Sequence, residues 1–265
     1  DRRGLPDQLP HVIGLTGPPG AGKSTIINGL LPYFDTDRKI AVLLVDPSSR
    51  ASGGAVLGDR VRMLDWGDER IYLRSQANRG QEGGLAPSTG ALVDLFAVLG
   101  FGTILIETVG VGQDGIDIAA VCDTTVVIQS PQSGDVVQSM KAGILEIGDI
   151  FVVSKAELPG SHTTVRDLNA MVQLADYEID DWVPKVIPVS AAESRGFDQL
   201  AAAIAQHREH EPPFDKIKRQ QWETEKRAGS LIRKAIRTGE TDVTGREERV
   251  RSALTSALAS LGQPH

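Results

Sequence analysis

Hydrophobic runs and amphipathic stretches alternate along most of the chain. The hydrophobic runs are rich in β-branched residues, and several are apolar almost throughout, as strands buried on both faces of a sheet are. This alternation predicts an α/β fold with a mostly parallel central sheet flanked by helices. The predicted strands are 11–17, 39–46, 70–75, 103–109, 124–130, 149–155 and 185–190. The predicted helices are 22–31, 88–99, 135–147, 163–177 and 196–208.

The pattern changes towards the C-terminus. Residues 214–238 and 245–261 have the periodicity of charged helices and are separated by "TGETDVTG". We therefore divide the chain into a short N-terminal remnant (1–10), an α/β domain (11–210) and a C-terminal helical extension (211–265). The first helix of the extension has an apolar stripe beside basic residues, so it packs either onto its own α/β domain or against a second copy in a homodimer. The stripe consists of Ile217, Trp222, Leu231, Ile232 and Ile236.

Composition removes several classes of function. The net charge of -7 argues against binding to nucleic acid or anionic lipid. A single cysteine, Cys122, excludes an internal disulfide framework and a Cys-rich metal site. His207 and His210 lie one turn apart on a predicted helix, but no third ligand is near, so we expect a solvated face rather than a metal site.

No targeting or membrane segment is evident. No apolar run approaches the roughly 18 residues that a membrane span needs. The start "DRRGLPDQLP" lacks the apolar core of a signal peptide, so we expect a cytoplasmic protein. The chain begins at Asp1 without an initiator Met, and we expect that some N-terminal sequence is missing.

The stretch "GPPGAGKS" after the first strand fits G-x-x-x-x-G-K-[ST], the phosphate-binding P-loop. Glycines let successive backbone N–H groups point at a phosphate, and the following helix adds its partial positive charge. Lys23 would reach the β- and γ-phosphates, and the Ser24 hydroxyl would bind Mg²⁺. The expected nucleotide-binding residues here are Gly17, Pro18, Pro19, Gly20, Ala21, Gly22, Lys23, Ser24 and Thr25.

A bound Mg²⁺ needs further oxygen ligands. The strand "TILIE" ends at Glu107, and "ETVG" resembles the D-x-x-G switch of GTPases, in which Gly110 would give its amide to the γ-phosphate. Asp46 ends the strand "AVLLVD" and is favoured as a ligand over the alternative of a helix or turn cap. Asp59, in the Gly-rich "SGGAVLGDR", is either a ligand or a solvated loop acid.

Base recognition is expected in the loops after later strands. The place of the GTPase signature N-K-x-D reads Ser154-Lys155-Ala156-Glu157. The Glu157 carboxylate can accept two parallel N–H bonds from guanine, and the Lys155 stem can pack along the base. Ser154 lacks the amide that normally ties the loops together. Guanine is therefore favoured over adenine, with "VSAAESRG" as the loop behind the base; its contributing residues are Ser190, Ala191 and Ala192.

Together these segments resemble one family. "GLTGPPGAGKST", "VDPSS", "GGAVLGDRVRM", "ETVGVGQ" and "QSMKAGILEI" are similar to the ArgK/MeaB GTPases, chaperones of adenosylcobalamin-dependent acyl-CoA mutases such as methylmalonyl-CoA mutase. The resemblance runs from about residue 11 to 208. It implies a P-loop GTPase of the broader class that includes the nickel-insertion GTPases of hydrogenase and urease, whose Cys/His-rich segments this chain lacks. It also implies GTP and Mg²⁺ as ligands, slow hydrolysis that the mutase accelerates, and gating of adenosylcobalamin delivery.

The resemblance also implies roles for particular residues. Residues 107–117 would form the second switch and 131–141 a further switch, with Lys141 swinging toward the nucleotide; taken alone, Lys141 would be a surface lysine on a helix. The catalytic set is then Lys23, Glu107, Gly110 and Lys141, and the Mg²⁺ set is Ser24, Asp46, Asp59 and Glu107.

The residues themselves favour slow turnover. The position after the switch glycine is Val111, which cannot orient water as a Gln does, and Gln113 would do so only if the loop refolds. No arginine finger is fixed in cis, although Arg50 and Arg60 are candidates. Hydrolysis completed by a partner that orders the switches is our hypothesis.

Departures from the family pattern leave other functions open. The base signature is altered, the P-loop begins at Gly17 without the long helical arm of family members, and the C-terminal helices match loosely. The alternatives are a small-molecule kinase or ATPase with the same P-loop, a nickel metallochaperone, and a nucleotide-dependent scaffold without hydrolysis. The identity of a mutase client stays open.

Overall fold

The structure is a computed structural model, and it describes residues 9–35, 37–46, 68–77, 85–86, 88–108, 117–131 and 146–210. All of them belong to the first of two units, Asp1–Asp215 and Lys216–His265. The predicted C-terminal helices and most of the predicted helix 135–147 lie outside the described residues, so these predictions remain open.

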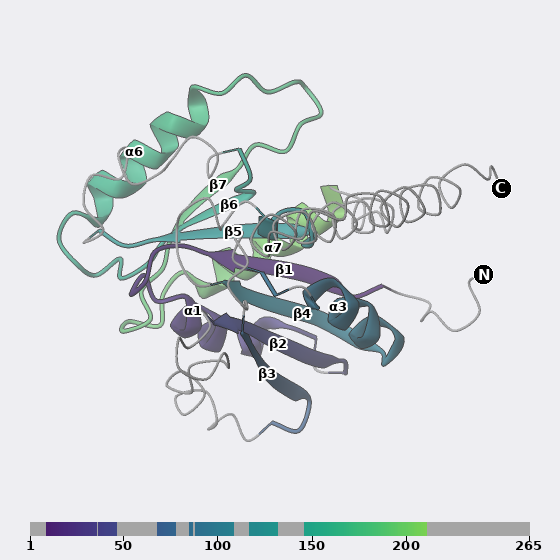
Figure 1. The fold of residues 1–265 in the computed structure, drawn as a ribbon. Helices are drawn as coiled ribbons and strands as arrows, with labels where there is room; N and C mark the ends of the chain where they lie inside the picture. Colours follow the sequence, from purple (N-terminus) through teal and green to yellow (C-terminus); the bar gives the residue numbers. More distant parts are fainter. Residues whose placement is uncertain are drawn as a thin grey trace, which may run out of the picture. The chain divides into compact units, whose positions relative to one another are not determined.

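A seven-stranded sheet forms the centre of the domain (Figure 1). Its spatial order is β3-β2-β4-β1-β5-β6-β7, and every neighbouring pair is parallel, which confirms the predicted α/β fold. The strands are β1 (His11–Thr16), β2 (Lys39–Asp46), β3 (Ile71–Ala77), β4 (Phe101–Thr108), β5 (Thr124–Gln129), β6 (Ile150–Val153) and β7 (Lys185–Pro188).

Helices cover both faces of the sheet, as right-handed crossovers between parallel strands require. The connections that contain α3 and α6 run in the opposite direction across the sheet from the connection that contains α1, so these helices lie on opposite faces. The described helices are α1 (Lys23–Leu30), the short 3₁₀ helix η1 (Leu31–Tyr33), α3 (Thr89–Val98), α6 (Ser161–Gln173) and α7 (Phe197–His210).

The alternation of side chains along the strands places successive residues in cores on opposite faces of the sheet. On β5, Val126 and Ile128 join the cluster that packs against α1 and α7, whereas Val127 joins the smaller cluster under α6. Near α3, the rings of Tyr72, Phe96 and Phe101 contact one another. Burial on both faces explains why the central strands read as continuous apolar runs.

Because the strands are parallel, their carboxyl ends meet at one edge of the sheet, where α/β proteins bind ligands. The strand order reverses at β1, which lies between β4 and β5. The chain leaves β1 there through the glycine-rich loop, so the fold places this loop at the usual ligand crevice.

The opposite edge, formed by the amino ends of the strands, holds both ends of the described domain. Arg208 donates from Nη2 to the carbonyl oxygen of Leu9 over 3.1 Å. Nearby, His207 is only 2% exposed and bonded to Thr124, so the prediction that it lies on a solvated face is wrong. His210 is exposed, as predicted. Helical spacing showed which residues share a face but not that β5 supplies a partner for His207.

A candidate nucleotide-binding edge

The glycine-rich loop has a backbone that only glycine adopts easily. Gly17, Gly20 and Gly22 have φ of 152°, 75° and 88°. A Cβ on Gly17 would lie 2.1 Å from the carbonyl oxygen of Ile128, so β5 also excludes a side chain there. Gly22 begins α1 without a side-chain cap, which leaves the first amides of the helix for an anion. The loop therefore has a backbone conformation suited to binding a phosphate.

Lys23 folds over this loop. Its side chain is buried, and Nζ donates to the carbonyl oxygens of Gly17 (2.9 Å) and Pro18 (3.1 Å). Both acceptors are loop carbonyls, and phosphate oxygens are stronger acceptors for an ammonium group. The ammonium group is thus already positioned at the loop in which a phosphate would bind.

Ser24 and Glu107 meet beside the loop although they are far apart in the sequence. The Ser24 hydroxyl lies 3.0 Å from each carboxylate oxygen of Glu107, which is 8% exposed. A hydroxyl and a carboxylate are hard oxygen ligands of the kind that Mg²⁺ prefers, so this donor set fits the ion. Asp46 ends β2 next to β4, where Val45 pairs with Thr108.

The hydroxyl of Ser154 ties the loop after β6 to the phosphate loop. It donates to the carbonyl oxygen of Ala21 (2.6 Å) and lies 3.0 Å from that of Gln129. The serine thus lacks the usual amide, but its hydroxyl still ties these two loops together. The backbone after β6 passes close to Ala21, so a short hydroxyl spans the gap that a longer amide would fill. Lys155 follows with φ of 53°, a conformation that side chains rarely adopt.

Glu157 is held in its charged form. A hydrogen bond from the Ser190 hydroxyl, then one from its own backbone N–H, then the charges of Arg195 and Lys155, lower the pKa of this exposed carboxyl. The loop after β7 is brought close by the bond from Ala156 N to the carbonyl oxygen of Val189 (3.1 Å). A carboxylate therefore stands ready beside Lys155, as the sequence predicts for a base site.

Residues of the loop after β7 complete this arrangement. Ser190 and Arg195 form a backbone bridge, and Arg195 also pairs with Glu193 at 2.8 Å. Ala191 and Ala192 are exposed at the turn. Sequence reasoning missed Arg195 and Glu193, because charged residues on a loop rarely reveal their partners.

A second missed residue lies at the end of β5. Gln129 is fully buried, and among the described residues neither atom of its carboxamide has a hydrogen-bond partner. A polar residue ending the apolar run "TTVVIQ" is the signal that was available. An unpaired buried amide destabilises a fold unless another contact compensates for it.

Several predicted site residues lie outside the described residues: Asp59, Gly110 and Lys141, together with most of the two switches, 107–117 and 131–141. Within the described ranges, no group of three or more His, Cys, Asp or Glu side chains could hold a metal ion. The Ser24–Glu107 contact is therefore the part of the proposed metal site that can be described.

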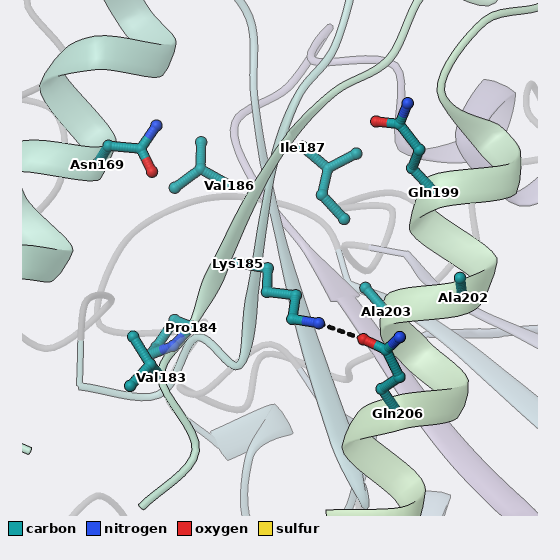
Figure 2. Close-up of a pocket in the computed structure, with 10 residues that line it drawn as sticks. All are labelled: Asn169, Val183, Pro184, Lys185, Val186, Ile187, Gln199, Ala202, Ala203 and Gln206. Atoms are coloured by element: carbon teal, nitrogen blue, oxygen red, sulfur yellow. Dashed lines mark hydrogen bonds between the residues drawn. The ribbon is translucent and has the colours of Figure 1, made fainter.

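A groove of about 590 Å³ lies elsewhere, along the edge strand β7 between α6 and α7 (Figure 2). Asn169 faces it from α6, and Lys185 reaches across it to Gln206 of α7. None of the predicted nucleotide-binding residues lines this groove. In the described part of the chain, no helix is long and apolar enough to cross a membrane.

The geometry agrees with comparisons to known proteins. A family model described as methylmalonyl-CoA mutase-associated GTPase MeaB matches residues 9–242. The chain belongs to the MeaB family. A putative GTPase of Pyrococcus abyssi is 40% identical over 203 residues, which are 75% of this chain and 63% of that protein. The GTPase ArgK of Escherichia coli is 36% identical over 72% of this chain and 60% of its own length. This MeaB-family chain thus spans less than two thirds of the length of the curated relatives it matches.

Another relative and two solved structures extend the comparison. The mitochondrial methylmalonic aciduria type A homolog of Mus musculus is 37% identical over 71% of this chain and 46% of its own. A structure titled LAO/AO transport system kinase covers 97% of this chain and 83% of its own, with a TM-score of 0.62 and 22% identity. The hydrogenase maturation factor HypB of Archaeoglobus fulgidus covers 74% and 89%, with a TM-score of 0.56 and 21% identity. These structural likenesses establish the P-loop GTPase fold.

Proposed function

We propose that this MeaB-family chain binds and hydrolyses GTP with Mg²⁺ and gates adenosylcobalamin delivery to, and protection of, an acyl-CoA mutase. The observation that carries the proposal is the Ser24–Glu107 contact beside the phosphate loop. It joins the residue that opens α1 to the acid that ends the strand next to β1. Ser24 and Glu107 would hold Mg²⁺ at this junction, and the ion would supply positive charge to offset the charge that develops on the phosphate.

Guanine selection would come from the two loops that meet beside the phosphate loop. The Glu157 carboxylate is kept charged by Ser190, and a charged carboxylate accepts two N–H bonds from guanine but has no matching donors on adenine. Ser154 would hold the base loop at a fixed distance from the phosphate loop. Preorganisation of this kind increases discrimination, because a misplaced carboxylate would pair poorly with either base.

The mutase and cobalamin part of the proposal rests on family membership and on the names of relatives. Stimulation by the mutase is implied by the family, and Val111 supports it because valine stands where many GTPases have a water-positioning residue. We also propose a cytoplasmic location and a homodimer.

Calorimetric titration with GDP, a GTP analogue, ADP and an ATP analogue, each with Mg²⁺, tests the nucleotide part. We expect guanine nucleotides to bind at least tenfold more tightly, a difference of about 1.4 kcal/mol. Glu157→Ala should remove the preference, whereas Glu209→Ala, an exposed acid of α7, should leave it unchanged. Ser154→Ala should weaken the binding of both GDP and the GTP analogue. Equal or tighter adenine binding would contradict the proposal and favour a kinase or ATPase.

The partner part is tested by phosphate release from GTP with and without adenosylcobalamin-dependent mutases, such as methylmalonyl-CoA mutase. We expect slow release alone and a large increase with the client mutase. Release that no mutase changes would leave a GTPase without the proposed chaperone role.

A further inference from the structure

A chain of polar side chains, buried except for the partly exposed Asp149, crosses the edge of the sheet opposite the phosphate loop. His11 Nε2 lies 2.8 Å from Thr124 Oγ1, which lies 2.9 Å from His207 Nδ1. His207 Nε2 lies 3.4 Å from Asp149 Oδ1. His11 and His207 are 5% and 2% exposed. This row of hydrogen-bonded side chains therefore joins β1, β5, the start of β6 and the last turn of α7.

The hydrogen bonds along this chain of side chains can all be made with His11 neutral. With a proton on Nε2 of each ring, His11 donates to Thr124, Thr124 donates to His207, and His207 faces the Asp149 carboxylate. A second proton on His11 would place a charge in a buried site close to Arg208.

Neighbouring groups fix the geometry from the other elements. Trp182 donates from Nε1 to the carbonyl oxygen of Asp149 (2.8 Å), and its ring meets that of His207 edge-on at 4.9 Å. The ring also lies 5.6 Å from His210. Lys185 stands over the same ring at 5.1 Å and bonds to Gln206 (Figure 2).

Two carboxylates complete the charged surroundings. Asp149 Oδ2 accepts from the backbone N of Thr125 (2.6 Å), and Asp123 Oδ2 accepts from that of Val12 (2.7 Å). Both are therefore engaged by the backbone of the strands that the polar chain joins. The cations near the site are Arg208, whose charge acts on His11, and Lys185 over the Trp182 ring, and they disfavour a further positive charge there.

We propose that His11, Thr124, His207 and Asp149 form a pH-sensitive clamp that fastens the last turn of α7 to the sheet at neutral pH and releases it in mild acid. When the last turn separates from β1 and β5, both imidazoles reach water. The clamped form holds His11 neutral, and the released form lets it accept one proton.

The direction of the switch follows from burial. Desolvation first, then the charge of Arg208 and then His207, lower the pKa of His11 from 6.5 to about 3. An exposed imidazole takes up its proton near pH 6.5. Below that pH the released form binds one proton more than the clamped form, so each pH unit favours release about tenfold.

Amide hydrogen exchange of residues 203–210 between pH 7.5 and 4.5, corrected for intrinsic rates, measures the release. We expect protection of this turn to fall about tenfold per pH unit below pH 6.5, while the amides of β4 stay protected. His11→Gln keeps a donor toward Thr124 but takes no proton, so this slope should disappear. His162→Gln, on the exposed side of α6, should behave as the wild type does.

Thr124→Val tests the clamp without removing a titrating group. It keeps the shape of the side chain and breaks the polar chain, so the turn should already exchange faster at pH 7.5. Equal slopes in wild type and His11→Gln would overturn the proposal. So would loss of β4 protection with the same slope, which would mean that acid unfolds the whole domain.

Discussion

At the scale of single residues, the unpaired carboxamide of Gln129 stands out. Its two polar atoms are buried at the end of β5, and its backbone oxygen accepts from Ser154 N over 2.8 Å. The side chain therefore loses its water contacts on folding and gains no hydrogen bond from the part of the chain that the structure describes. A buried polar group without a partner lowers the free energy of unfolding by about 1–3 kcal/mol.

Replacing Gln129 by leucine should stabilise the domain by about 1–2 kcal/mol, because an apolar side chain of similar size removes that cost. Thermal or urea unfolding of the purified protein measures the change. Gln173→Leu, on the exposed surface of α6, is the matched control and should shift stability little. A loss of stability in Gln129→Leu would show that the carboxamide has a partner in solution.

Ser154 shows where prediction from sequence stops at this scale. The sequence indicated which residues would reach the base and phosphate loops, and the structure brings Ser24 and Glu107 together as expected. The hydrogen bond from Ser154 to Ala21 requires the hydroxyl oxygen of one loop to lie 2.6 Å from the carbonyl oxygen of the other, and no residue pattern encodes that distance. Contacts between loops follow from the packing of the strands that carry them.

At the scale of elements, α1 and α7 approach each other at a glycine. A Cβ on Gly29 would lie 2.1 Å from the ring of Phe197, which is 6% exposed. A glycine inside a helix normally costs about 1 kcal/mol relative to alanine. Close packing of the two helices explains why the glycine is tolerated.

Gly29→Ala should therefore destabilise the domain by about 1–2 kcal/mol, in spite of the better helix former, because the added methyl overpacks the contact with Phe197. Unfolding by urea measures this. Phe197→Leu alone should also destabilise, but the double variant should lose less than the sum of the two losses. Additive losses would show that the two positions do not interact.

Periodicity located the described elements but not all of their ends. The seven strands lie where β-branched runs predicted them, whereas α6 ends at Gln173 rather than at residue 177. The apolar positions that mark a helix continue beyond it, since Tyr177 packs against the core from the following loop. Periodic apolar positions therefore show which residues are buried, but not always that those residues are helical.

At the scale of the whole molecule, His11 links stability to pH. Its pKa is about 3 in the folded domain and 6.5 when exposed, so the unfolded chain binds more protons between these values. The contribution of His11 to the free energy of unfolding is fully present above pH 6.5 and decreases as the pH falls from 6.5 towards 3. Relative to His11→Gln, the wild type should lose about 1.4 kcal/mol between pH 7.5 and 5.5. Urea unfolding at both pH values checks this, and parallel behaviour of the two proteins would contradict it.

The alternation of strands and helices predicted the sheet and its parallel direction, because burial on both faces leaves a clear record in the sequence. The sequence did not predict the spatial order of the strands or the hydrogen-bonded row of polar side chains at the amino-end edge. His11, Thr124 and His207 are distant in sequence, and each alone reads as an ordinary polar residue. Their association arises only when the whole sheet is assembled.

The bond between Arg208 and Leu9 has a consequence for how the domain can be connected. Entry and exit of the polypeptide lie side by side, at the edge of the sheet away from the nucleotide loops. A module with this layout can be spliced into a longer polypeptide, or joined head to tail by a short peptide and reopened elsewhere, without disturbing the loops that hold phosphate. Rearrangement of genes can therefore attach new neighbours to this domain while its chemistry stays intact.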